Sequence, residues 1–206
     1  MLNQLLALTF IILFLAAKNA HSDLPADTKV TKSGNVVNYE TQGNLEITNQ
    51  VNCEGFEKLT NNFTPADLYR GMTHCFGSKN YENAAQLFIL AGVFGRFDVQ
   101  RVADSTAHQA MSVLQMQVFQ NLSNEERDKY KQALGKYLSQ GSPQLIAACE
   151  KVRQIGAPEY FPRYMIQHGM RAFGAEQANQ GLVSNFQPEA AWEKSLDTYL
   201  HCPKRK

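Results

Sequence analysis

The chain has 206 residues, 44% of them hydrophobic and 19% charged, which is enough to bury the core of one domain. Twenty basic side chains stand against 19 acidic ones, so the formal net charge is only +1. Binding to nucleic acid or to an anionic membrane needs clustered Lys and Arg, and this balance argues against both classes of function. We interpret the three basic residues at 204–206 as a solvated tail.

The first residues predict a secretory signal peptide. Residues 5–17 are almost unbrokenly apolar, a run of 13 that falls short of the roughly 20 residues a membrane-spanning helix needs. The small residues Ala20 and Ser22 follow, so we expect cleavage near Ser22–Asp23, removal of residues 1–22 and secretion or release into the periplasm. No Lys or Arg precedes the run, and an uncleaved signal anchor is the alternative. Loss of Lys18 would take the basic count from 20 to 19, equal to the acidic count, with no stable membrane anchor left.

All four cysteines follow the predicted cleavage site: Cys53, Cys75, Cys149 and Cys202. An even number of cysteines in an exported chain favours disulfides. Three pairings are possible, and we favour Cys53–Cys75 with Cys149–Cys202 because each bond ties a poorly helical or terminal segment to a helix. A zinc site is the alternative, but the chain has no C-x-x-C pair, so we expect neither a metal nor another cofactor.

Two regions with different patterning follow the signal. Residues 23–52 are polar, with Gly34 and Gly43 between short β-like pieces, which predicts an extended arm or a weak hairpin around Ser33–Asn35. From residue 53 onward apolar residues recur at helical intervals between good capping residues. We therefore expect residues 53–206 to form one all-α domain of about seven helices in antiparallel hairpins, a repeat-like array.

Capping signals place the starts of these helices. Thr64 and Ser142 each precede a proline, Asn80 precedes an apolar stripe, and Ser123 opens a capping box. The helices are expected to begin near residues 65, 81, 98, 124, 143, 162 and 188. We expect the first to end near residue 76, the third to reach 118, the fifth to stop at Gly156 and the sixth to reach 173. The glycines at 92 and 95 predict a sharp turn between the second and third helices.

The second helix carries a recognisable spacing: Tyr81, Ala84, Phe88 and Ala91. It resembles the second helix of a tetratricopeptide repeat, whose small alanines let two helices approach closely. The helix before it fits less well, because Gly71 and Met72 reverse the usual order and Cys75 replaces an aromatic residue. The resemblance covers residues 65–94, without a second copy at the family period of 34. It implies a concave surface that recognises a peptide or a protein.

One pair of residues has catalytic potential. Asp104 and His108 lie four residues apart, so on the expected third helix an acid could orient an imidazole as a general base. The chain has no glycine-flanked G-x-S-x-G nucleophile turn, and a surface ion pair is the simpler interpretation. An exported hydrolase using this pair is our second hypothesis.

The residues from Tyr160 to Met170 are dense in aromatic side chains and methionine, types enriched in recognition surfaces. Our candidate partner-binding residues are Arg96, Arg163, Tyr164 and His168. The alternative is that Tyr164, Met165 and His168 form the inner face of a short helix. The leading hypothesis is an exported, non-enzymatic module that binds a protein partner, as a periplasmic adaptor or an immunity protein against a secreted toxin. A small-ligand carrier is a third hypothesis.

Overall fold

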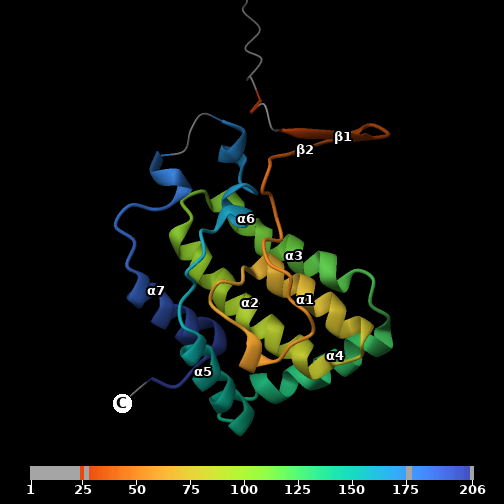
Figure 1. The fold of residues 1–206 in the computed structure, drawn as a ribbon, viewed down its shortest axis with the longest axis vertical. Helices are drawn as coiled ribbons and strands as arrows, with labels where there is room; N and C mark the ends of the chain where they lie inside the picture. The colour runs from red at the N-terminus through yellow and green to blue at the C-terminus, as the bar shows by residue number, and fades with distance from the viewer. Residues whose placement is uncertain (1–23, 26–27, 175–177, 205–206) are drawn as a thin grey trace, which may run out of the picture.

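The computed structural model describes residues 24–25, 28–174 and 178–204, so the predicted signal peptide lies outside the described part (Figure 1). The prediction of a mainly α-helical chain is confirmed: seven α-helices and one two-stranded sheet make up the regular structure of this part, together with short 3-10 and π segments. Among the described residues, no helix is both long enough and apolar enough to cross a membrane.

The elements follow one another along the chain in this order. Strands β1 (Lys29–Ser33) and β2 (Val36–Glu40) precede the 3-10 turn η1 (Phe56–Lys58), α1 (Pro65–Gly77) and α2 (Tyr81–Arg101). Then come η2 (Ser105–Gln109), α3 (Ala110–Phe119), α4 (Asn124–Leu138), α5 (Pro143–Ile155) and α6 (Arg163–Ile166). The last elements are η3 (Met170–Phe173), η4 (Ala178–Gly181), α7 (Pro188–Ser195) and the π-helix η5 (Leu196–Leu200).

The predicted hairpin is present as β1 and β2, joined by the two residues 34–35. Gly34 has φ +59°, a backbone conformation that glycine adopts without strain. The hairpin stands clear of the helices (Figure 1). Beyond it the arm returns to the helical body, where the backbone N–H groups of Thr48 and Asn49 donate to Asp67 Oδ1 at 2.7 and 2.9 Å. Asp67 also completes the capping box of α1 with Thr64, so one carboxylate fixes both the arm and the helix start.

The long helix α2 runs through the middle of the molecule, and α1, α4, α7 and η5 all pack against it (Figure 1). One aromatic cluster joins four helices: Phe76 of α1, Phe88 of α2, Phe119 of α3 and Tyr130 of α4. Ring centroids in it lie between 5.2 and 6.1 Å apart, mostly edge to face. The core therefore forms around α2, which positions everything described below.

The prediction of a turn at Gly92 and Gly95 is wrong, because α2 continues through both residues to Arg101. A Cβ on Gly92 would overlap the Tyr199 hydroxyl, and one on Gly95 would overlap the end of Met111. The two glycines, three apart on one helix face, thus let other side chains approach the helix backbone. Asp98 does not begin a helix either, since it is fully buried inside α2.

The predicted helix from 98 to 118 is therefore replaced by a break and a shorter helix. The chain leaves α2 at Val102, Asp104 caps η2, and α3 starts only at Ala110. The predicted helix 162–173 is also wrong: α6 has four residues, and a separate 3-10 turn follows it. There the N–H of Arg171 donates to Asp104 Oδ2 at 2.9 Å, a tertiary bond that a continued helix would not make.

The remaining starts and both disulfides agree with prediction. Capping residues Ser123 and Ser142 open α4 and α5, and α5 ends at Gly156 with φ +89°. Cys53 is bonded to Cys75, and Cys149 to Cys202, in the favoured pairing. The second bond joins α5 to Cys202, two residues beyond the end of the π-helix, and it fixes this segment against the helical body.

Candidate binding site

Asp104 and His108 do not form the pair that the sequence indicated. Asp104 accepts hydrogen bonds from Thr106 N, Thr106 Oγ1 and Arg171 N, at 2.9, 2.7 and 2.9 Å. Burial raises the pKa of its carboxyl, but these donors outweigh burial and hold the pKa below its ordinary value. His108 Nε2 instead lies 3.0 Å from the Val102 carbonyl oxygen, so it carries the proton and donates it there. The imidazole is oriented by a backbone carbonyl, and Asp104 serves as a helix cap.

Tyr164 is not available at the surface. It is 2% exposed, and its hydroxyl donates to Asp98 Oδ2 at 2.7 Å, beside Tyr160, which donates to the same oxygen at 2.9 Å. Asp98 Oδ1 accepts from Arg101 Nε at 2.8 Å. Burial raises the pKa of Asp98, while the guanidinium and both hydroxyls oppose that shift. The two tyrosines thus supply hydrogen bonds to a buried carboxylate and join α6 to α2. This agrees with the alternative that Tyr164 lies on the inner face of a short helix.

Arg163 and His168 hold the arm. Arg163 is exposed, and its side chain lies against Gly43, whose missing side chain leaves it room. His168 is half-buried with Nδ1 2.8 Å from Asn44 Oδ1, and burial lowers its pKa. Leu45 N also donates to the Tyr164 carbonyl oxygen at 3.0 Å. These contacts give residues 163–168 a structural role in docking the segment that follows the hairpin.

Arg96 and His108, proposed separately from sequence, line the same pocket. It has a volume of about 250 Å³ and lies between α2, α3 and the π-helix. Gly92, Gly95, Val99 and Met111 form its apolar part. Arg96, His108, Ser112, Gln115 and Tyr199 supply polar groups. We call this the Arg96 pocket.

Three side chains that line the Arg96 pocket carry hydrogen-bond donors: Arg96, Ser112 and Tyr199. The Arg96 guanidinium carbon lies 5.7 Å from the ring centre of Tyr199, a cation–π contact. Burial raises the pKa of Tyr199 to about 12, against the lowering effect of Arg96, so its hydroxyl stays protonated at neutral pH. Ser112 adds an exposed hydroxyl, and none of the described residues lining the pocket is acidic. An anion or another hydrogen-bond acceptor would complement these three donors chemically.

The π-helix places Tyr199 in the pocket. Its wide turns end at His201, which has a left-handed φ of +56°, and Cys202 N then donates to the Leu196 carbonyl oxygen at 3.0 Å. On the opposite wall Gln115 Nε2 donates to the Tyr69 hydroxyl at 2.9 Å, which fixes Gln115. Single π turns are frequent at functional sites, and here one brings a phenol over a glycine of the central helix.

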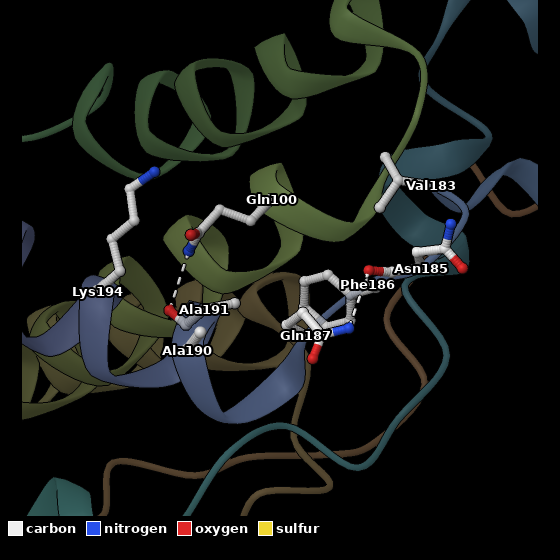
Figure 2. A pocket seen from close by; sticks show the side chains of 8 residues that line it. All are labelled: Gln100, Val183, Asn185, Phe186, Gln187, Ala190, Ala191 and Lys194. Carbon is white, nitrogen blue, oxygen red and sulfur yellow. Dashed lines mark hydrogen bonds between the residues drawn. The ribbon is translucent and has the colours of Figure 1, made fainter.

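Figure 2 shows a second hollow, a wide groove of about 480 Å³ between the end of α2, residues 183–187 and α7. Two of the three side-chain amides that line it, those of Gln100 and Gln187, donate within the protein. Gln100 Nε2 donates to Ala191 O at 3.0 Å, and Gln187 Nε2 donates to Asn185 O at 3.3 Å (Figure 2). Gln100 Nε2 also donates to Ser195 Oγ at 2.9 Å. Phe186, beside them, packs on Phe97 with ring centres 5.3 Å apart. The groove is therefore the place where residues 183–187 pack against α2 and α7, and these contacts give it a structural explanation.

Sequence reasoning missed Tyr199, Ser112, Gln115 and the two glycines. The available signal was the glycine spacing of three inside a strongly apolar stretch, which marks one helix face without side chains. No group of three or more His, Cys, Asp or Glu side chains within the described ranges is arranged to hold a metal ion. No protein-family model matches the chain, and no curated protein or solved structure matches it.

Proposed function

We propose that the protein is an exported, non-enzymatic binding module that takes one acidic side chain of a protein partner into the Arg96 pocket. The observation that carries the proposal is the convergence of Arg96, Ser112 and Tyr199 on one pocket without an acidic residue among its described lining. An Asp or Glu carboxylate offers the charge and the acceptor atoms that these donors lack.

The size of the pocket favours a partner's side chain over a free ligand. Sites for small molecules measure about 300–1,000 Å³ and enclose most of the ligand. The Arg96 pocket, at about 250 Å³, is smaller and partly open. It suits the end of one side chain presented by a larger molecule, which supports protein binding over the carrier hypothesis.

The contacts of His108 count against the hydrolase hypothesis. A general base of this type needs an orienting acid and a nucleophile within hydrogen-bond reach. Asp104 is committed to Thr106 and Arg171, so it is not available to orient the imidazole. His108 is better explained as a residue that lines the wall of the pocket.

Two intramolecular disulfides are compatible with an oxidising extracellular or periplasmic location. Together with the sequence pattern of residues 1–22 they support the proposal of export. A periplasmic adaptor and an immunity protein would both fit this proposal, since each acts by binding a protein partner.

Photo-crosslinking from a position beside the pocket tests the proposal. Met116 is exposed and lies one turn of α3 beyond Ser112, outside the pocket lining. A photoreactive phenylalanine at Met116, expressed in the native host, is expected to yield one crosslinked protein partner. Introducing Arg96→Ala into the same chain should remove that product, because the acidic side chain loses its cation. The same amino acid at Gln132, an exposed position on α4, is the matched control.

The two positions together give a clear decision. A product at 116 that depends on Arg96 and is missing at 132 supports the proposal. A product that survives Arg96→Ala, or that forms equally at both positions, contradicts it. The absence of any product at 116 contradicts it as well, provided that circular dichroism shows the variant folded.

A further inference from the structure

The hairpin of β1 and β2 presents an uncovered apolar face. Val30 pairs with Tyr39 and Lys32 with Val37, so these four side chains share one face of the ribbon. Val30, Val37 and Tyr39 are 53%, 41% and 49% exposed. Isolated two-stranded ribbons are marginal in water, and no described helix covers this one (Figure 1).

The two edges of the ribbon differ in charge. Lys29 and Lys32 lie on β1, and edge lysines are a common protection against strand pairing because they repel a second copy. The one charged residue of β2 is Glu40, half-buried at its end, and the exposed positions from Val37 to Tyr39 carry no lysine, no proline and no charge. The β2 edge is therefore the open one.

We infer that two copies of this chain pair through β2, antiparallel, with Asn38 opposite Asn38 across a two-fold axis. The ribbon closes with Ser33 opposite Val36 across a two-residue loop. In that geometry the closing pair exchanges hydrogen bonds, and the pattern alternates along the strands. The backbone groups of Asn38 therefore face β1, while those of Val37 and Tyr39 face outward.

The register follows from these outward groups. With Asn38 on the axis, Val37 of each copy lies opposite Tyr39 of the other, and all four outward residues exchange N–H···O bonds. Each of these pairs joins an aromatic to a β-branched side chain on the shared apolar face, a favourable cross-strand combination. A shift by one residue would turn the apolar face of one copy against the polar face of the other.

The equivalent pairing through β1 is disfavoured. It would bring four lysines, two from each copy, onto neighbouring strands. The dimer through β2 is small, since stable interfaces bury about 1,200–2,000 Å² and two five-residue strands bury less. It is expected to be weak and dependent on concentration. It is independent of the proposed function, because the hairpin contributes no residue to the Arg96 pocket.

Engineered cysteines test this register directly. Asn38 would form a pair without backbone hydrogen bonds, with Cα atoms about 4.5 Å apart, inside the range that a disulfide accepts. Asn38→Cys in the disulfide-intact mature chain should therefore give a covalent dimer under mild oxidation. The dimer should be linked through residue 38, as peptide mapping would show. Thr31→Cys, opposite Asn38 on β1, is the matched control and should stay largely monomeric.

A second variant separates pairing from chance collision. Adding Val37→Lys to Asn38→Cys should suppress the covalent dimer, because it places a charge on the open edge of both copies. The inference is overturned if Thr31→Cys dimerises as readily as Asn38→Cys, or if Val37→Lys leaves the yield unchanged. It is also overturned if residue 38 links to another protein in place of a second copy.

Discussion

The hydroxyl of Tyr199 occupies the space beside Gly92 where any other residue would place its Cβ. A phenol from the last helical turn of the chain thus rests on the backbone of the central helix. The contact joins the C-terminal π-helix to α2 and forms one side of the Arg96 pocket.

Gly92→Ala should displace Tyr199 and destabilise the fold by about 1–3 kcal/mol, the usual cost of overpacking a core. Gly135→Ala is the control, because Gly135 lies inside α4 and a Cβ there would have nothing within 4 Å beyond its own stretch of helix. That control should stabilise the protein by about 0.5–1 kcal/mol through helix propensity. Urea unfolding of both variants measures the contrast, and an equal effect of the two would refute the close contact.

Asp104 should make stability depend on pH. Its folded pKa lies below the unfolded value of about 3.9, so its stabilisation is complete above about pH 4 and is lost as the pH falls through the folded pKa. Asp104→Asn removes the charge and should cost about 1–3 kcal/mol at neutral pH. The difference in unfolding free energy between wild type and variant should shrink in acid. A difference that stays constant down to about pH 3 would show that the carboxylate charge is not stabilising.

The two disulfides should contribute unequally. Loop-closure entropy predicts about 3 kcal/mol for Cys53–Cys75 and about 4 kcal/mol for Cys149–Cys202, because their sequence separations are 22 and 53. The double variants Cys53→Ser/Cys75→Ser and Cys149→Ser/Cys202→Ser, compared by chemical denaturation, measure this order. The second double variant should also weaken partner binding, since it releases Cys202, which anchors the chain two residues beyond the π-helix. If both double variants bind the partner equally well, the Cys149–Cys202 disulfide does not support the pocket.

Two tyrosine hydroxyls should behave in opposite ways. Tyr164→Phe removes a donor from buried Asp98 and should cost about 1–2 kcal/mol of stability without a direct effect on binding. Tyr199 makes no side-chain hydrogen bond to another described residue, so Tyr199→Phe should change stability by less than about 0.5 kcal/mol while weakening binding. Thermal unfolding and affinity for the crosslinked partner separate the two roles. A large stability loss in Tyr199→Phe would make its hydroxyl structural.

Export predicts a defined mass for the native protein. Mass spectrometry should find a chain lacking about 22 residues. It should also find four fewer hydrogens than the reduced chain has, because both disulfides are formed. A full-length chain, or free thiols at the four cysteines, would contradict the assignment of compartment.

Helix starts were predictable from sequence because a capping residue acts only on its near neighbours in the chain. Thr64, Ser123 and Ser142 each satisfy backbone N–H groups within three residues of themselves, so their effect can be read without the fold. The disulfide pairing was predictable from the contrast between helical and irregular patterning, since each bond ties a terminal or irregular segment to a helix.

The middle of the chain was not predictable because distant residues decide it. Gly92 and Gly95 carry no information about the side chains of Tyr199 and Met111 that fill their space. Asp104 leaves the helical conformation because residues 106 and 171 bind its carboxylate. The Arg96 pocket depends on both features, so only two of its polar residues, Arg96 and His108, were found from sequence.

The central claim is that Arg96 binds an acidic side chain of a partner, and a charge swap measures it most directly. Once crosslinking identifies the acid, Arg96→Glu should weaken affinity at least about tenfold in calorimetry, a change of about 1.4 kcal/mol. Replacing that acid with Arg in the partner should restore much of the affinity for Arg96→Glu. Unchanged binding by Arg96→Glu, or no restoration by the swap, would contradict the claim.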